Sequence, residues 1–88
     1  MKDFFIKTCR GHQFEFTRVM SAGSDTWYHI SVILNDVLIK YRMRSNKGGE
    51  WKITFERLPN ILYSLEAEFN DLIKANETPP NTNEARGW

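Results

Sequence analysis

Hydrophobic and polar residues alternate along the first two thirds of the chain, which predicts a series of β-strands. Successive side chains of a strand point to opposite faces of a sheet, and β-branched and aromatic residues suit such half-buried positions. The alternation is clearest in the stretch VLIKYRMR, where Val37, Ile39, Tyr41 and Met43 alternate with Leu38, Lys40, Arg42 and Arg44. The predicted strands cover residues 3–9, 13–19, 27–34, 37–44 and 51–55.

The connections between these strands are short and rich in turn residues, so neighbouring strands should pair antiparallel. Residues 10–12 form a predicted turn, and Asn35-Asp36 is a two-residue connection whose residues both tolerate positive φ. Residues 21–26 are too few to hold a crossover helix. The adjacent glycines of residues 45–50 permit a tight loop. The sequence therefore predicts an antiparallel meander.

The hydrophobic spacing then changes to three and four residues, which predicts one amphipathic helix over residues 58–73. Pro59 suits the first helical turn, and Glu66, Glu68 and Asp71 should face water. A lone helix of this length is marginal in water, so it should pack on the sheet. The predicted fold is α+β: a curved antiparallel β-meander of four to five strands with one C-terminal amphipathic helix packed on its apolar face. Its hydrophobic stripe comprises Leu58, Ile61, Leu62, Leu65, Phe69, Leu72 and Ile73.

Length and composition place this pattern in one small folded domain. The chain has 88 residues, of which 41% are hydrophobic and 26% charged, so wholesale disorder is excluded. Residues 1–75 form the predicted βββββ-α domain. Residues 76–88 are polar, contain consecutive prolines and lack periodicity, so we predict a flexible tail ending in Trp88.

Charge is distributed unevenly between the two halves of the chain. Residues 1–55 hold nine Lys or Arg against five Asp or Glu, and residues 56–88 hold three against six, which gives +4 and −3 and a total of +1. A basic sheet half suits an anionic partner, but opposite charges also suit self-association. With one cysteine, no signal-peptide pattern and no apolar run long enough to span a membrane, we predict a cytoplasmic protein with no membrane partner.

Recognisable catalytic, metal-binding and cofactor-binding motifs are absent from the sequence. His12 and His29 have no acidic or nucleophilic residue at a recognisable spacing, and a Cys9–His29 pair is conceivable only if the fold brings the two together. Lys47-Gly48-Gly49 lacks the context of a phosphate-binding loop, and no metal-ligand spacing occurs. We therefore predict a non-enzymatic protein with no catalytic residue, metal or cofactor.

The face of the predicted sheet opposite the helix carries the remaining candidate chemistry. Cations can neutralise phosphates there, and interleaved aromatic rings can stack on unpaired bases, which favours single-stranded DNA or RNA. A sheet with one wet face also carries basic residues with no ligand, and exposed Trp27, Ile33 and Leu38 could instead bind a protein partner or a second copy. The candidate nucleic-acid-binding residues are Trp27, His29, Lys40, Arg42, Arg44 and Lys52, with Arg18 near an edge.

The passage VLIKYRMRSNKGGEWKITFERLPNILYSLEAEFNDLI resembles the single-stranded nucleic-acid-binding domains of the positive-cofactor-four, Pur-alpha and whirly group. The similarity covers residues 27–74: a hydrophobic-basic strand, a glycine-containing loop, a second strand and a helix opened by Leu58-Pro59. It implies a homodimer formed through helices and sheet edges, a role for Trp27 in base stacking, and contacts to the nucleic-acid backbone. Those contacts would come from Lys40, Arg42, Arg44 and Lys52.

Overall fold

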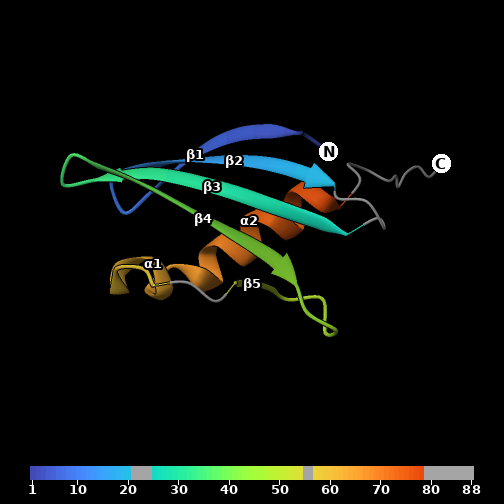
Figure 1. Cartoon of the computed structure of the whole chain (residues 1–88). Coiled ribbons are helices and arrows are strands. Elements are labelled where there is room, and N and C mark those ends of the chain that lie inside the picture. Colours follow the sequence, from blue (N-terminus) through green and yellow to red (C-terminus); the bar gives the residue numbers. More distant parts are fainter. Residues whose placement is uncertain (21–24, 55–56, 79–88) are drawn as a thin grey trace.

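Antiparallel strands, each beside the next in the chain, form a five-stranded sheet in the order β1-β2-β3-β4-β5 (Figure 1). The computed structural model describes residues 1–20, 25–54 and 57–78. This architecture confirms the predicted α+β meander with helical structure packed on the sheet. The strands are β1 (Phe4–Cys9), β2 (His12–Met20), β3 (Thr26–Leu34), β4 (Val37–Ser45) and β5 (Trp51–Ile53), and the helices are α1 (Asn60–Ser64) and α2 (Glu66–Glu77).

Two tight turns set the register within two strand pairs, β1–β2 and β3–β4. Arg10 and Gly11 have φ values of 53° and 80°, and Asn35 and Asp36 have values of 50° and 65°. Two consecutive residues with positive φ give the turn whose twist matches that of the paired strands. Their positions fix the register of β1 on β2 and of β3 on β4, and so fix which side chains share a face.

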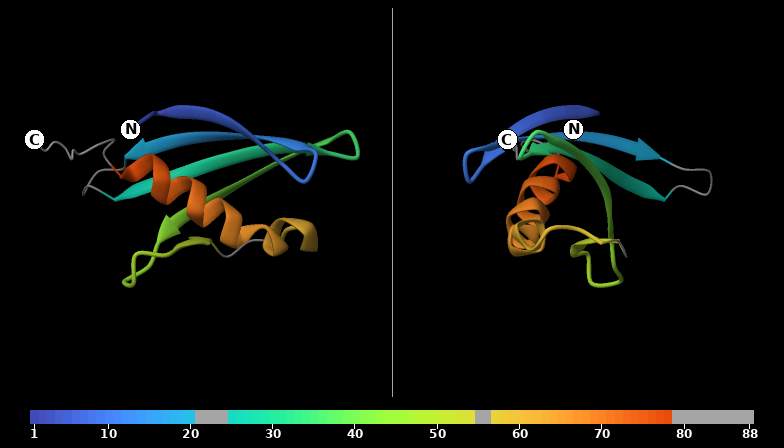
Figure 2. Two further views of the ribbon diagram at one scale, coloured as in Figure 1. Left: turned by 180° about the vertical axis from the view of Figure 1, so that it is seen from behind. Right: turned by 60° about the vertical axis from the view of Figure 1, so that its left-hand side comes forward.

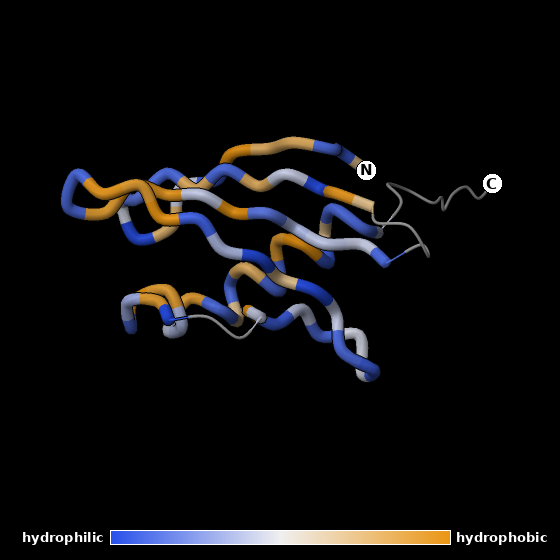
Figure 3. Tube along the Cα trace, in the orientation of Figure 1, coloured by the Kyte–Doolittle hydropathy of each residue, from blue (hydrophilic) through white to orange (hydrophobic). Residues whose placement is uncertain are grey.

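Helix α2 lies across one face of the sheet, and the strands arch over it (Figure 2). Alternate residues of the strands point towards the helix, where apolar burial supplies the main stabilisation of the fold. Hydrophobic residues also follow β1 and flank the tip of the β3–β4 hairpin (Figure 3). The largest fully buried side chains are Phe14, Phe16, Tyr28, Ile30 and Met43 from the strands and Leu62, Leu65, Phe69 and Ile73 from the helical segment.

The predicted C-terminal helix is present on the sheet, but it is broken at Leu65 into α1 and α2, so its bounds differ from the predicted residues 58–73. Pro59 precedes α1 with an extended ψ of 145°, and is not part of its first turn. The Leu65 N–H bonds the carbonyl oxygen of Leu62, a tight turn of the 3₁₀ type, and α2 begins at the next residue. Leu62 of α1 and Phe69 of α2, on either side of the break, are both fully buried. Among the described residues, neither helix is long and apolar enough to cross a membrane.

Helix α2 continues through Glu77, beyond the point where the hydrophobic pattern was expected to stop. The Asn76 side chain donates to the Lys2 carbonyl oxygen at 2.9 Å and to the Tyr28 hydroxyl at 2.7 Å, and it accepts from the Lys2 N–H at 3.0 Å. Asn76 and Glu77 thus belong to the folded helix and not to a polar tail. Residues 79–88, with Trp88, lie outside the described residues.

The outer edge of β5 is covered by two side chains of α2. The Trp51 N–H donates to the Asn70 side-chain oxygen at 2.6 Å, and the Ile53 N–H donates to a Glu66 carboxylate oxygen at 2.7 Å. Glu66 therefore does not simply face water as predicted, whereas Glu68 and Asp71 are exposed. Strand β5 ends at Ile53, short of the predicted end at residue 55, which lies outside the described residues. Covered in this way, β5 is a poor template for another strand.

Candidate nucleic-acid interface

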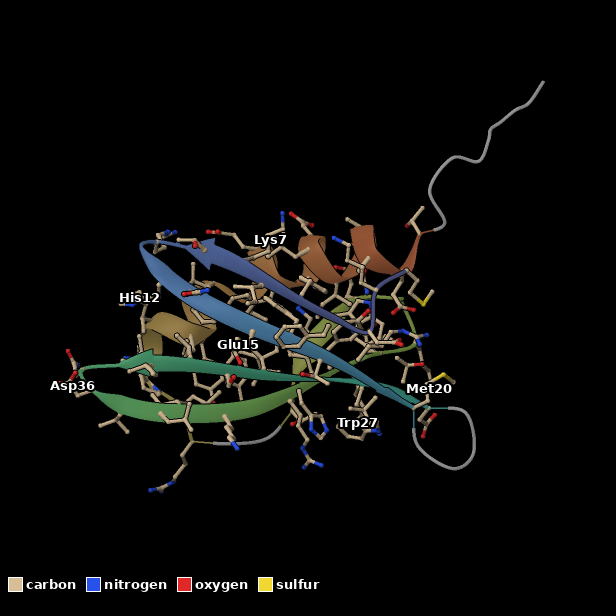
Figure 4. The ribbon with its side chains drawn as sticks, turned by 90° about the horizontal axis from the view of Figure 1, so that it is seen from above. Lys7, His12, Glu15, Met20, Trp27 and Asp36 are labelled. Atoms are coloured by element: carbon tan, nitrogen blue, oxygen red, sulfur yellow. The ribbon has the colours of Figure 1, made fainter. Side chains whose placement is uncertain are left out.

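The face of the sheet turned away from α2, here called the open face, carries the predicted site residues. On β3, Tyr28 and Ile30 are buried beneath the sheet, so Trp27 and His29 point to the other side. Figure 4 shows Trp27 on the side away from α2 and Lys7 of β1 on the side of α2. The predicted alternation therefore holds. All six predicted residues take open-face positions: Trp27, His29, Lys40, Arg42, Arg44 and Lys52.

The strand register gathers these residues into one block. On β3 and β4, Trp27 stands opposite Arg44, and His29 opposite Arg42. Lys52 of β5 stands opposite Arg44 on its other side. Residues directly opposite each other in antiparallel strands have their Cβ atoms about 5 Å apart. The cations therefore lie together over β4 and β5, and not on separate edges of the sheet.

Two arginines are stacked on the ring of Trp27. The guanidinium carbons of Arg42 and Arg44 lie 4.9 Å and 5.2 Å from the ring centroid. A guanidinium over an indole face is attracted by the ring quadrupole, which holds the arginine side chains in a defined orientation. The open face therefore presents an aromatic ring and two positive charges as one unit.

Two hollows flank this unit on the open face. The larger, of about 440 Å³, is bordered by hydroxyl, imidazole and cationic groups, and the other, of about 390 Å³, lies beside Trp27, Arg44 and Lys52. Each falls within the size range of small-ligand sites. Thr17 and Ser31 were missed as lining residues, although their strand positions and register could have placed them there. The larger hollow is lined by Thr17, His29, Ile30, Ser31, Lys40, Tyr41 and Arg42.

The positive region ends towards β2 and β1. Glu15 of β2 stands opposite Ser31 on the open face, and Phe4 and Ile6 of β1 follow beyond it. Because the strands arch over α2, the open face is the outer side of the curve, and its hollows lie between side chains (Figure 2). A polyanion would therefore meet positive charge along β4 and β5 and a mixed apolar surface along β1.

Arg18 does not lie on the open face, which corrects its predicted place near that surface. It shares the helix side of β2 with Phe14 and Phe16, and its Nε donates to a Glu77 carboxylate oxygen at 2.7 Å. The Tyr28 hydroxyl donates to the same carboxylate. Arg18, Tyr28, Asn76 and Glu77 form a polar cluster, the helix-end cluster, which fastens the end of α2 to the sheet.

The helix-end cluster shifts the pKa values of two of its members. Burial alone raises the pKa of Glu77, but the hydrogen bonds from Arg18 and Tyr28 outweigh it, so this pKa lies below its ordinary value. Burial, with the hydrogen bond to Glu77, raises the pKa of Tyr28 to about 12. Glu77 is therefore ionised and Tyr28 protonated at neutral pH, the states that their hydrogen bond requires.

Replacing Glu77 with Gln is expected to destabilise the protein by about 1.5–3 kcal/mol at pH 7, the usual contribution of hydrogen bonds to a charged group. Since the folded pKa of Glu77 is lowered, its contribution is complete above the unfolded pKa of about 4.3 and is lost as the pH falls through the folded pKa. Urea unfolding at pH 7 and pH 3 should show the variant approaching the wild type in acid. An unchanged difference at both pH values would contradict this assignment. Glu68→Gln, at an exposed ion pair with Arg10, is the control, with an expected change below about 0.5 kcal/mol.

Cys9 and His29 do not form the catalytic pair that was conceivable from the sequence. Cys9 is buried on the helix side of β1, while His29 is exposed on the open face. Burial, reinforced by the nearby Glu68 carboxylate, raises the pKa of the Cys9 thiol, which disfavours the nucleophilic thiolate. Within the described ranges, no three His, Cys, Asp or Glu side chains are grouped as metal ligands would be.

Comparisons of the chain with known protein families, with curated proteins and with solved structures find no match. A function for the open face therefore has to be inferred from its own geometry and chemistry.

Proposed function

We propose that the protein is a small binding module that takes up single-stranded DNA or RNA on the open face. The observation that carries the proposal is the stacking of Arg42 and Arg44 on Trp27, on a sheet face turned to solvent. Cationic groups attract phosphates, and an aromatic ring beside them stacks on a base. Single strands suit this arrangement because their bases are free to leave one another.

Each group has a distinct role in the proposed complex. Lys40, Arg42 and Arg44 alternate along β4 at spacings of about 7 Å, and Lys52 extends the row sideways onto β5. This row follows the phosphate backbone. A base stacks on Trp27 when a guanidinium leaves the ring for a phosphate, and the hydroxyl and imidazole groups of the larger hollow provide further polar contacts.

The clustering of charge supports a binding role over a merely solvated face. Like charges directly opposite each other in a sheet are destabilising, yet Arg44 stands opposite Lys52. A face that needed only solubility could carry separated charges of both signs. An anionic ligand would relieve the repulsion.

A fluorescence-anisotropy titration with a labelled oligothymidine at about 50 mM salt tests the proposal. We expect saturable binding that weakens as salt is added. An abasic oligonucleotide of equal length is the matched control, and it should bind more weakly because stacking contributes about 1–3 kcal/mol per base. Absence of binding would overturn the proposal, and equal binding of the abasic strand would overturn the role of Trp27.

The second candidate function is a protein-interaction module or small regulatory subunit with no nucleic-acid ligand. Ile33 and Leu38 stand directly opposite each other on the open face and are 63% and 58% exposed. Paired exposed aliphatic residues favour contact with another protein surface. For a second copy bound at this patch, light scattering should show that Leu38→Asp lowers the mass of the assembly. An unchanged mass would contradict self-association there. The homodimer and the cytoplasmic location remain predictions from the sequence.

A further inference from the structure

The two outer edges of the sheet differ in how they are protected. The edge of β5 is covered by Asn70 and Glu66, whose side chains accept its outward N–H groups. On β1, the Arg18 N–H donates to the Asp3 carbonyl oxygen at 2.8 Å, which shows that the backbone groups of odd-numbered residues face β2. Those of Phe4, Ile6 and Thr8 therefore point away from the sheet. Within residues 1–20, 25–54 and 57–78, no other group hydrogen-bonds to them.

The side chains along β1 add an apolar surface to this open edge. Phe4 and Ile6 are 51% and 42% exposed on the open face. Along this edge, a groove of about 500 Å³ runs between β1 and α2. Phe4 and Ile6 line it together with Phe5, Leu72 and Ala75 among others. Proteins usually protect an edge with charges, proline or a covering element. The first half of β1, Phe4-Phe5-Ile6, provides none of these, and the first charged residue of the strand is Lys7.

We propose that β1 pairs antiparallel with β1 of a second copy of this chain, so that one sheet runs through both copies. The hydrogen bonds between the two β1 strands must come from residues whose backbone groups point outward, which are Phe4, Ile6 and Thr8. Only a few registers of one β1 strand on the other satisfy this condition. The register with Phe4 opposite Ile6 of the other copy also sets Phe5 opposite its counterpart and Asp3 opposite the other copy's Lys7. The two copies are related by a two-fold axis, so this register forms the pair of Asp3 with Lys7 twice, once on each side of the axis.

The neighbouring registers are less favourable. Placing Ile6 opposite its own counterpart would set Lys2 against Arg10 of the other copy, and like charges facing each other destabilise a sheet. Placing Phe4 opposite its own counterpart shortens the overlap and leaves Lys7 without Asp3. Charge complementarity therefore selects the register with Phe4 opposite Ile6, where two hydrogen-bonded pairs supply about four backbone hydrogen bonds.

The free stretch of β4 is a poorer edge for a second copy. Strand β4 pairs with β5 only from Met43 to Ser45, so residues 37–41 lack an outer strand among the described residues. Pairing two copies there would bring together two rows containing Lys40, Arg42 and Arg44, which repel each other. Along β1, by contrast, the charges of Asp3 and Lys7 offset each other. The inference uses only the edges of the sheet, so it does not depend on nucleic-acid binding.

Sedimentation velocity over the micromolar range tests the proposal by charge exchange. We expect the wild type to form a dimer, and Asp3→Lys or Lys7→Asp alone to raise its dissociation constant at least about tenfold, because each change places like charges at two symmetric positions. The double variant D3K/K7D should restore the wild-type constant to within about threefold. Rescue by exchange excludes a general folding defect as the cause.

Two further variants test whether the dimer forms through the edge of β1 or through the free stretch of β4. Ile6→Pro removes an N–H that points outward, a position where an edge strand tolerates proline, and it should give a monomer with an unchanged circular dichroism spectrum. Leu38→Asp, on the free stretch of β4, should leave the dimer intact. A monomeric wild type, a failed rescue, or dissociation by Leu38→Asp alone would overturn the proposal. The oligothymidine titration on the same variants reports separately on the open face.

Discussion

Replacing Arg42 and Arg44 together with alanine is expected to weaken oligothymidine binding on the order of 100-fold at about 50 mM salt. Each cation that neutralises a phosphate of a single strand contributes about 0.7 to the slope of log affinity against log salt. The double variant should therefore bind with a slope about 1.4 smaller than that of the wild type. Anisotropy titrations at four or five salt concentrations give both quantities.

The matched control removes two arginine charges from positions outside the open face. Arg10 lies in the β1–β2 turn, and Arg57 lies between β5 and α1, so neither occupies a strand position of the open face. Their double alanine variant has the same net charge as the Arg42 and Arg44 variant. It should keep a slope close to that of the wild type. Equal losses in the two variants would show that net charge, and not the open face, governs binding.

Replacing Phe69 with alanine is expected to cost about 3–5 kcal/mol of unfolding free energy. Its ring is fully buried, with centroids 5.0 Å from Phe14 and 6.0 Å from both Phe16 and Tyr41. Truncation removes the contact of this ring with two strands, β2 and β4, and leaves a cavity that rigid aromatic neighbours cannot fill. Small domains have a total stability of about 5–15 kcal/mol, so this variant loses a large share of it.

Urea unfolding followed by circular dichroism measures this loss from the shift in midpoint at a constant slope. Asp71→Ala is the control on the same helix. Asp71 is exposed, so its replacement should change the stability by less than about 0.5 kcal/mol. A Phe69→Ala protein within 1 kcal/mol of the wild type, as an order of magnitude, would contradict the central role of this ring.

The strands and their faces were predictable from the sequence because their signals are local. Alternation along residues 37–44 places Arg42 and Arg44 on one side whatever the rest of the chain does. Turn residues such as Asn35-Asp36 then fix the pairing of adjacent strands. The stacking of the arginines on Trp27 was not predictable, because it depends on side-chain conformations that a residue pattern does not determine.

The errors concern contacts between residues far apart in the chain. Leu62, Leu65 and Phe69 have helical spacing whether the helix is continuous or broken. The hydrophobic pattern therefore could not predict the turn at Leu65. The end of α2 was missed for a related reason. Glu77 completes the helix by bonding Arg18, which lies 59 positions earlier, so misplacing Arg18 and ending the helix early were one error.

Helix α2 packs on the core and also protects the edge of β5 from pairing with another strand. Strand β5 has only three residues, and both of its outward amides bond to helix side chains. If α2 detaches transiently, those amides become open to deuterium exchange and to pairing with other chains at the same moment. The resistance of the β5 edge to pairing with other chains is therefore set by how rarely the helix detaches, and not by the composition of β5 itself.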